Sequence, residues 1–96
     1  MTFCIGTSFF MSELNNNCSD AKAEIVGSPV ECMNTAKHFQ ENEKEIHFGG
    51  NVFDKSFPRG CFVEESDSSM EIHWNHHSFG SKNKNSRQIC TQDGKN

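Results

Sequence analysis

Five widely spaced cysteines limit what this chain can fold into more than any other feature. They stand at Cys4, Cys18, Cys32, Cys61 and Cys90 of 96 residues. No two lie close enough for a C-x-x-C metal or redox motif. Zinc ligands usually come in close pairs, so this spacing favours disulfides between distant elements, with free buried thiols as the alternative. Because five is odd, at least one thiol stays free or bridges to another chain.

The apolar content explains why such a chain needs covalent support. Nine residues are Phe and only Leu14 is leucine, and Leu, Ile, Val and Phe together make up about one residue in five. A single small domain of this polarity usually needs a staple or a partner. Disulfides persist in oxidising surroundings, so we expect an extracellular or organelle-lumen location.

The N-terminal sequence and the net charge limit the kinds of partner that we expect for this chain. The apolar start MTFCIGTSFFM has no Lys or Arg before Lys22, so no export signal is visible. No run approaches the ~18 apolar residues of a membrane span. The formal net charge is −4, and the only basic grouping is Lys82, Lys84 and Arg87. We therefore predict neither a membrane span nor a nucleic-acid partner.

The clearest structural signal is SPVECMNTAKHF, which predicts a helix over residues 29–41. Ser28 is a good N-cap, Pro29 suits the first helical position, and Glu31 completes a capping box. The spacing that follows makes one narrow apolar stripe facing the core, formed by Cys32, Met33, Ala36 and Phe39.

Alternating apolar residues predict the strands. A short strand is expected at 23–26, and three more at 45–53, 61–65 and 70–75. The last two form a β-hairpin with the four-residue loop 66–69. Alternation places Ile72 and Trp74 on the inner face of the hairpin, opposite Glu71, His73 and Asn75.

The aromatic residues fall into two groups. Those inside the patterned region are expected in the core, with Phe62 and Trp74 lying against Phe39 and Ala36: Phe39, Phe48, Phe53, Phe62 and Trp74. Those before it are candidates for a patch that orders only on a larger partner: Phe3, Phe9 and Phe10.

The stretch EIHWNHHSFG, residues 71–80, raises the question of a metal site. Residues four apart on a strand lie roughly 13 Å apart, too far to share one metal. A turn at Asn75 would bring His73, His76 and His77 together as a zinc or copper set. Histidines that are solvated or bonded to backbone are the competing interpretation, so metal binding is the alternative function.

No residue pattern predicts catalysis. Neither a Ser-His-Asp order nor a glycine-rich phosphate loop nor a paired-carboxylate motif is present in the sequence. A thiol nucleophile at Cys61 beside the histidine strand is the third hypothesis. We predict a protein that is not an enzyme and that holds no cofactor.

The order of several short motifs between residues 18 and 91 resembles an uncharacterised cysteine-containing module that recurs in exported proteins of algae and other marine protists. These motifs are Cys18, Ile25-x-Gly-Ser28-x-x-Glu31-Cys32-x-x-x-Ala36, Pro58-Arg59-Gly60-Cys61-Phe62, Trp74-Asn75-x-His77, and Ile89-Cys90. Phe39 departs from the usual leucine, and Cys4 lies outside the pattern. The resemblance implies an exported or lumenal interaction role and makes Trp74, Asn75 and His77 parts of the architecture.

Together these features predict an α+β domain over 18–91, in which one helix packs on a small antiparallel sheet of about three short strands. An irregular N-terminal arm (1–17) precedes it and a tail (92–96) follows. The disulfide candidates, whose three pairings stay open, are Cys18, Cys32, Cys61 and Cys90. Cys4 is left for an intermolecular bridge.

The predicted function is a non-catalytic interaction or structural module, a small exported or lumenal subunit that docks on a larger protein assembly. One concrete version is a peripheral subunit on the thylakoid-lumen side of an algal photosynthetic complex. Another is a component of a cell-surface filament or wall.

Overall fold

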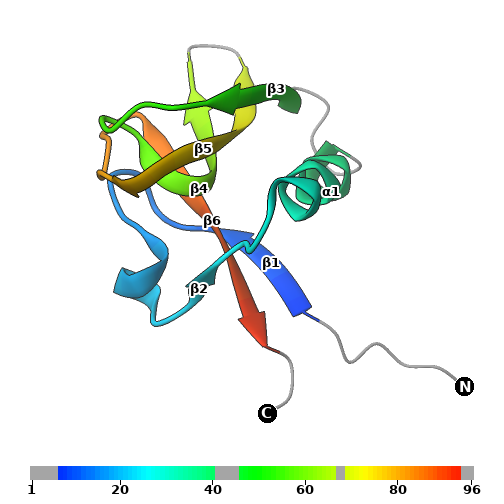
Figure 1. The fold of residues 1–96 in the computed structure, drawn as a ribbon. Helices are drawn as coiled ribbons and strands as arrows, with labels where there is room; N and C mark the ends of the chain where they lie inside the picture. Colours follow the sequence, from blue (N-terminus) through cyan, green and yellow to red (C-terminus); the bar gives the residue numbers. More distant parts are fainter. Residues whose placement is uncertain (1–6, 41–45, 67–68, 94–96) are drawn as a thin grey trace, which may run out of the picture.

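One helix packs on a six-stranded mixed sheet in a computed structural model that describes residues 7–40, 46–66 and 69–93 (Figure 1). The α+β class and the single helix are therefore confirmed. In chain order the elements are β1 (Thr7–Met11), the 3-10 helix η1 (Cys18–Ala21), β2 (Glu24–Ile25), α1 (Pro29–Gln40), β3 (Ile46–Val52), β4 (Pro58–Glu65), β5 (Met70–Gly80) and β6 (Ser86–Asp93).

The helix begins at the position that its N-terminal capping residues predict. The Ser28 hydroxyl accepts a hydrogen bond from the Glu31 amide at 3.2 Å, as predicted. The Glu31 carboxylate reaches one residue further back than in a standard capping box, to the Gly27 amide at 3.2 Å. Cys32 and Ala36 are buried and Phe39 is half-buried, whereas Met33 is 44% exposed.

The sheet is larger and differently connected than predicted. Its strand order is β1-β6-β4-β5-β3, and β2 also pairs with β6. The predicted hairpin of β4 and β5 is confirmed, but β3 pairs with β5 in parallel. The expectation of a small, purely antiparallel sheet is wrong, because β3 and β4 lie on opposite sides of β5 instead of pairing with each other.

Both ends of the described chain add strands that the sequence did not predict. The prediction of an irregular N-terminal arm is wrong for Thr7–Met11, because these residues form a strand that pairs antiparallel with β6. The tail prediction is wrong for residues 92 and 93, which extend β6. Phe9 and Phe10 are half-buried in β1. Phe3 and Cys4 lie outside the described residues.

The main core lies between α1 and one face of the sheet. Its buried members are Val26, Cys32, Ala36, Ile46, Cys61, Val63, Ile72 and Ile89, against which Phe39, Phe48 and Trp74 pack. Phe62 is absent from this core. It pairs with His73 on the opposite face and stacks on Phe57 at 5.2 Å between ring centroids. Phe62 therefore does not lie against Phe39 and Ala36 as predicted.

All four disulfide candidates are paired, which confirms the predicted staples. Cys18 bonds to Cys90 and Cys32 to Cys61, with Cα atoms 5.5 and 5.4 Å apart. The first bridge ties η1 to β6, and the second ties α1 to the centre of the sheet. Two disulfides in so small a domain indicate an oxidising compartment.

Removal of either bridge should destabilise the domain, and the longer loop should matter more. The bridges span 72 and 29 residues. Loop-closure entropy predicts a loss of about 4 kcal/mol for the double variant Cys18→Ala/Cys90→Ala and about 3.5 kcal/mol for Cys32→Ala/Cys61→Ala. Urea unfolding followed by tryptophan fluorescence measures both. An unchanged unfolding midpoint in either variant would contradict a stabilising role.

Candidate functional site

The Asn75 side chain stabilises the segment in which the chain crosses over β5 between β3 and β4. Since β3 and β4 lie on opposite sides of β5, residues 53–57 must pass from one side to the other. The Asn75 side chain is buried beneath this crossing. Its amide nitrogen donates to the carbonyl oxygens of Asp54 at 2.8 Å, Phe57 at 3.2 Å and Pro58 at 3.0 Å. Its oxygen accepts from the amides of Asp54 and His77, each at 3.1 Å.

Just beyond Asn75 the strand pairing is interrupted. Gly60 pairs with Asn75 and Pro58 pairs with Gly80, so one residue of β4 faces four residues of β5. This wide bulge leaves residues 76–79 largely exposed. Gly80 closes it with a φ of +61°, and a Cβ there would lie 2.4 Å from the Arg59 amide nitrogen. Glycine is therefore required at this position.

His77 is fixed in orientation by the bulge. Its Nδ1 accepts hydrogen bonds from the Phe79 and Gly80 amides at 3.2 and 3.1 Å. A nitrogen that accepts carries no proton, so we assign the neutral imidazole with its proton on Nε2. His77 thus keeps one N–H group that these backbone bonds do not use.

Two highly exposed phenylalanines flank His77. Phe53 is 71% exposed and Phe79 is 82% exposed. Their ring centroids lie 5.2 and 6.3 Å from that of His77. We call Phe53, His77 and Phe79 the aromatic cluster. The prediction that Phe53 belongs to the core is wrong, because Phe53 lies in the crossing segment, beyond the end of β3.

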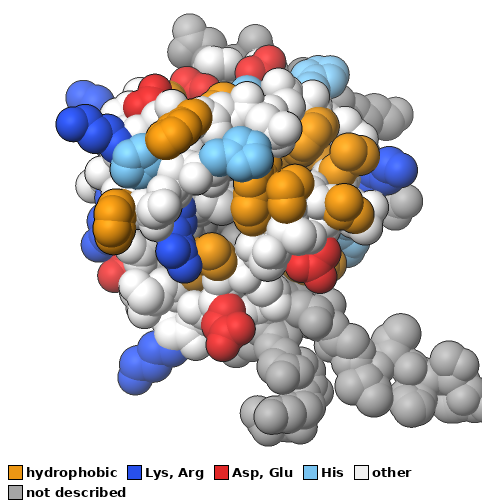
Figure 2. Space-filling view, in the orientation of Figure 1, with side chains coloured by type: hydrophobic (Ala, Val, Ile, Leu, Met, Phe, Trp, Pro, Cys, Tyr) orange, Lys and Arg blue, Asp and Glu red, His pale blue; other side chains and the backbone are white. Residues whose placement is uncertain are grey.

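Two shallow hollows adjoin the aromatic cluster. The larger, of about 480 Å³, is lined among others by Pro58, Phe79 and Lys82. The smaller, of about 280 Å³, lies beside Trp74, His76 and His77. Ile25 and Arg59 line both hollows. Figure 2 shows hydrophobic and histidine side chains on this face, with Lys and Arg side chains gathered along its left side.

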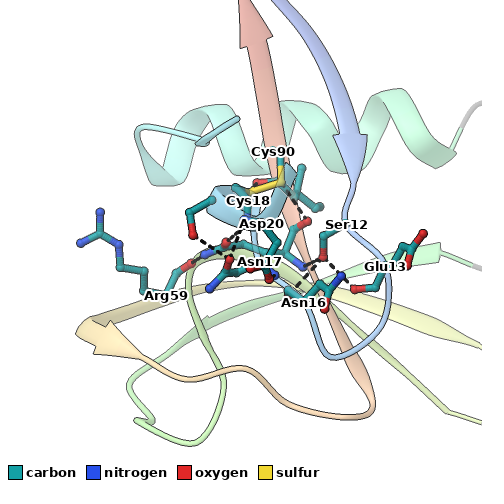
Figure 3. Close-up of a disulfide and its surroundings, with 11 residues drawn as sticks. Ser12, Glu13, Asn16, Asn17, Cys18, Asp20, Arg59 and Cys90 are labelled. Atoms are coloured by element: carbon teal, nitrogen blue, oxygen red, sulfur yellow. Dashed lines mark hydrogen bonds between the residues drawn. A yellow bond between two sulfur atoms is a disulfide. The ribbon is translucent and has the colours of Figure 1, made fainter. Parts of the chain in front are cut away.

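The wall of the larger hollow is fixed by hydrogen bonds to the Cys18–Cys90 bridge region (Figure 3). Buried Gln88 accepts from the Cys18 amide at 2.7 Å and donates to the Arg59 carbonyl at 2.7 Å. Asn17 caps η1 by accepting from the Asp20 amide at 3.1 Å. Through Gln88, the Arg59 backbone is therefore connected by hydrogen bonds to the backbone of the disulfide-bonded Cys18.

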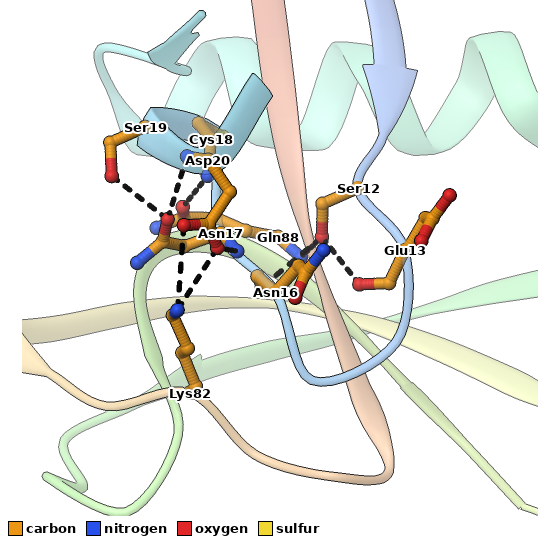
Figure 4. Close-up of polar contacts among 9 residues, drawn as sticks. All are labelled: Ser12, Glu13, Asn16, Asn17, Cys18, Ser19, Asp20, Lys82 and Gln88. Atoms are coloured by element: carbon orange, nitrogen blue, oxygen red, sulfur yellow. Dashed lines mark hydrogen bonds and ion pairs between the residues drawn. The ribbon is translucent and has the colours of Figure 1, made fainter. Parts of the chain in front are cut away.

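The cations at this end have different partners. Lys82 forms an ion pair with Asp20 at 3.1 Å (Figure 4). The Asn17 amide and then the Lys82 ammonium lower the pKa of the Asp20 carboxyl. Arg59 donates to the Ser78 carbonyl across the bulge at 3.2 Å. Arg87, which the sequence grouped with Lys82, instead pairs with Glu65 at 2.6 Å.

The structure separates the three histidines of the predicted metal set. The His77 ring accepts a hydrogen bond from the Gly80 amide within the bulge. The His76 ring lies edge-on to Trp74, with ring centroids 6.3 Å apart, and the His73 ring stacks on Phe62, with centroids 5.4 Å apart. Among the described residues no group of three or more His, Cys, Asp or Glu side chains is arranged to hold a metal ion.

His73 is a packed residue. It is 9% exposed, and its Nε2 lies 3.3 Å from a Glu71 carboxylate oxygen. Gly49 leaves room for its ring, because a Cβ there would lie 2.4 Å from His73 Cε1. As predicted, His73 lies on the face of β5 opposite to Ile72 and Trp74. The segment carrying Phe57 covers that face at Phe62 and Asn75.

The thiol hypothesis loses its nucleophile, because Cys61 is bonded to Cys32. The sequence analysis also did not predict that Phe53, His77 and Phe79 lie together. Gly80 next to Phe79 indicated an exposed turn at that position, and Asp54 next to Phe53 indicated the same. Nothing in the sequence showed that the two positions meet, because that depends on the crossing over β5.

Comparisons of the chain with protein-family models, with curated proteins and with solved structures find no match. Within the described residues, no helix is long and apolar enough to cross a membrane. What the site does must therefore be argued from its own geometry.

Asn75→Ala should destabilise the crossing and disorder the aromatic cluster. The change removes five hydrogen bonds, one of them to the buried Pro58 carbonyl, which we expect to lower the free energy of unfolding by about 3 kcal/mol. The ring-current shifts of His77 should also collapse in an NMR spectrum. Asn51→Ala, an exposed change of the same kind in β3, is the control. Equal stability of the two variants would show that Asn75 does not hold the crossing.

The turn of the crossing segment should loosen in acid. Hydrogen bonds from the Ser56 hydroxyl and amide, at 2.7 and 2.9 Å, lower the pKa of the Asp54 carboxyl below its ordinary 3.8. The stabilisation is therefore present above pH 3.8 and is lost as pH falls through the lower folded-state pKa. The Ser56 amide shift in an NMR titration measures this. Asp54→Asn should abolish the transition, and its persistence would assign it to another group.

Proposed function

We propose that this protein is a non-catalytic interaction module, a small exported or lumenal subunit that docks on a larger assembly through the aromatic cluster. The observation that carries the proposal is the exposure of Phe53 and Phe79 on either side of a fixed His77. Large aromatic side chains dominate binding energies at interfaces. The other Phe and Trp side chains whose burial the structure describes are all buried or half-buried.

The scaffold supports this role. Asn75 and the Gly80 bulge hold the two phenylalanines on backbone that is bonded in place, so little conformational entropy is lost when a partner binds. The two disulfides suit a module that works outside the reducing cytosol. The resemblance to modules of exported algal proteins supports the same setting.

Size analysis of the native protein tests the docking. After gentle extraction from its source, the chain should elute in size-exclusion chromatography far above its own 10.9 kDa. Added recombinant protein should enter the same fraction, whereas Phe53→Ser/Phe79→Ser should be excluded from it. Circular dichroism should show the variant folded, because both side chains lie outside the core.

Val30→Ser is the matched control, since Val30 is 67% exposed on α1, away from the aromatic cluster. It should enter the assembly fraction like the wild type. Elution of the native chain as a free monomer would refute the proposed function, and equal incorporation of the aromatic variant would place the docking surface elsewhere.

A further inference from the structure

We infer that the aromatic cluster and the cations around it bind an acidic polysaccharide. This inference rests on the proposed docking function and names the chemistry of the partner surface. A sugar ring has an apolar C–H face and a rim of hydroxyl groups. The aromatic cluster and its neighbours supply a complement to both parts, together with positive charge for carboxylate groups.

The aromatic rings fit the apolar face of a sugar. At 82% exposure Phe79 presents its ring largely to solvent, and Phe53 does nearly the same at 71%. Phe79 also contributes to the lining of the larger hollow, beside Ser81 and Lys82. Flat, protruding rings of this kind pack against the C–H face of a pyranose and leave its hydroxyls free for polar contacts.

The polar groups around the rings fit the hydroxyl rim. His77 has an Nε2 proton that its backbone bonds leave unused. The exposed side chains Ser78 and Ser81 lie on the same bulge and at its exit. The adjoining hollow of about 480 Å³ is shallow and includes Ser81 and Lys82 in its lining. Such open, wet sites suit ligands that keep much of their hydration.

The charge of this end favours an acidic chain over a neutral one. The formal net charge of the protein is −4, yet residues 53–60 and 76–85 carry four cationic side chains against one carboxylate, that of Asp54. The four are Lys55, Arg59, Lys82 and Lys84. The lining of the larger hollow adds one more carboxylate, that of Glu24. Hydrogen bonds from Ser56 already occupy the Asp54 carboxylate, and Asp20 pairs with Lys82. Arg59, between the two hollows, is the best placed cation for a ligand carboxylate.

A polysaccharide fits this surface better than an acidic peptide. Peptides bind by extending a sheet edge, by laying a helix in an apolar groove or by filling side-chain pockets. The cluster offers neither a sheet edge nor an apolar groove for a helix, because it lies on a bulge and a crossing segment, and the two hollows beside it are shallow and have polar residues in their lining. A repeating acidic sugar chain can instead place one ring on each phenylalanine and a carboxylate near Arg59.

Affinity electrophoresis of the oxidised full chain tests the inference. Gels containing polygalacturonate should retard the wild type, and gels containing neutral dextran should not. Phe53→Ser/Phe79→Ser keeps every charge and should weaken polygalacturonate binding at least tenfold, as loss of two aromatic contacts implies. Arg59→Gln should weaken it several-fold, whereas Lys37→Gln on α1 removes the same charge and should leave it unchanged.

Several outcomes would overturn the inference. Equal effects of Arg59→Gln and Lys37→Gln, or no effect of the aromatic variant, would reduce the binding to unspecific charge attraction. Soluble poly-glutamate that competes as well as polygalacturonate would point to an acidic protein partner. An unretarded wild type that still enters its native assembly would refute the polysaccharide while leaving the proposed function intact.

Discussion

The hydrogen bonds of Asn75 are the interaction on which the functional end of this molecule depends. The chain leaves β3, crosses β5 and enters β4 on its far side, and the backbone groups that face β5 at this crossing need partners. One side-chain amide serves three carbonyl oxygens and two amides there. Without it, all five groups would lose this partner, and among the described residues only the Asp54 and Phe57 carbonyls have a further backbone donor, in the Phe57 and Ser81 amides.

The exposed aromatic cluster follows from the same crossing. Phe53 stands on the crossing segment, whereas His77 and Phe79 stand on the bulge that opens after Asn75. Asn75 bonds to both segments, and the Ser81 amide also donates to the Phe57 carbonyl at 2.9 Å. Among the described Phe and Trp residues only Phe53 and Phe79 are exposed, and both lie at one end of the domain, where the cations of the loops also lie.

The disulfides fix the rest of the scaffold around this end. Cys32–Cys61 holds α1 on the centre of the sheet, and Cys18–Cys90 holds η1 on β6. Gln88 connects the second bridge to the Arg59 backbone, so the charged side of the site is tied to the disulfide that adjoins the larger hollow. Covalent constraint therefore replaces the large core that so polar a chain lacks.

The sequence by itself determined the local elements and the staples. Capping residues fixed α1, alternation fixed the β4–β5 hairpin, and cysteine spacing identified the four bridging residues, because these signals act through near neighbours or composition. The tertiary structure alone decided the disulfide pairing, the parallel β3, the added strand β1 and the exposure of Phe53. Each of these depends on which distant segments lie side by side, and burial of a strand face or of Asn75 has no signature in residue order.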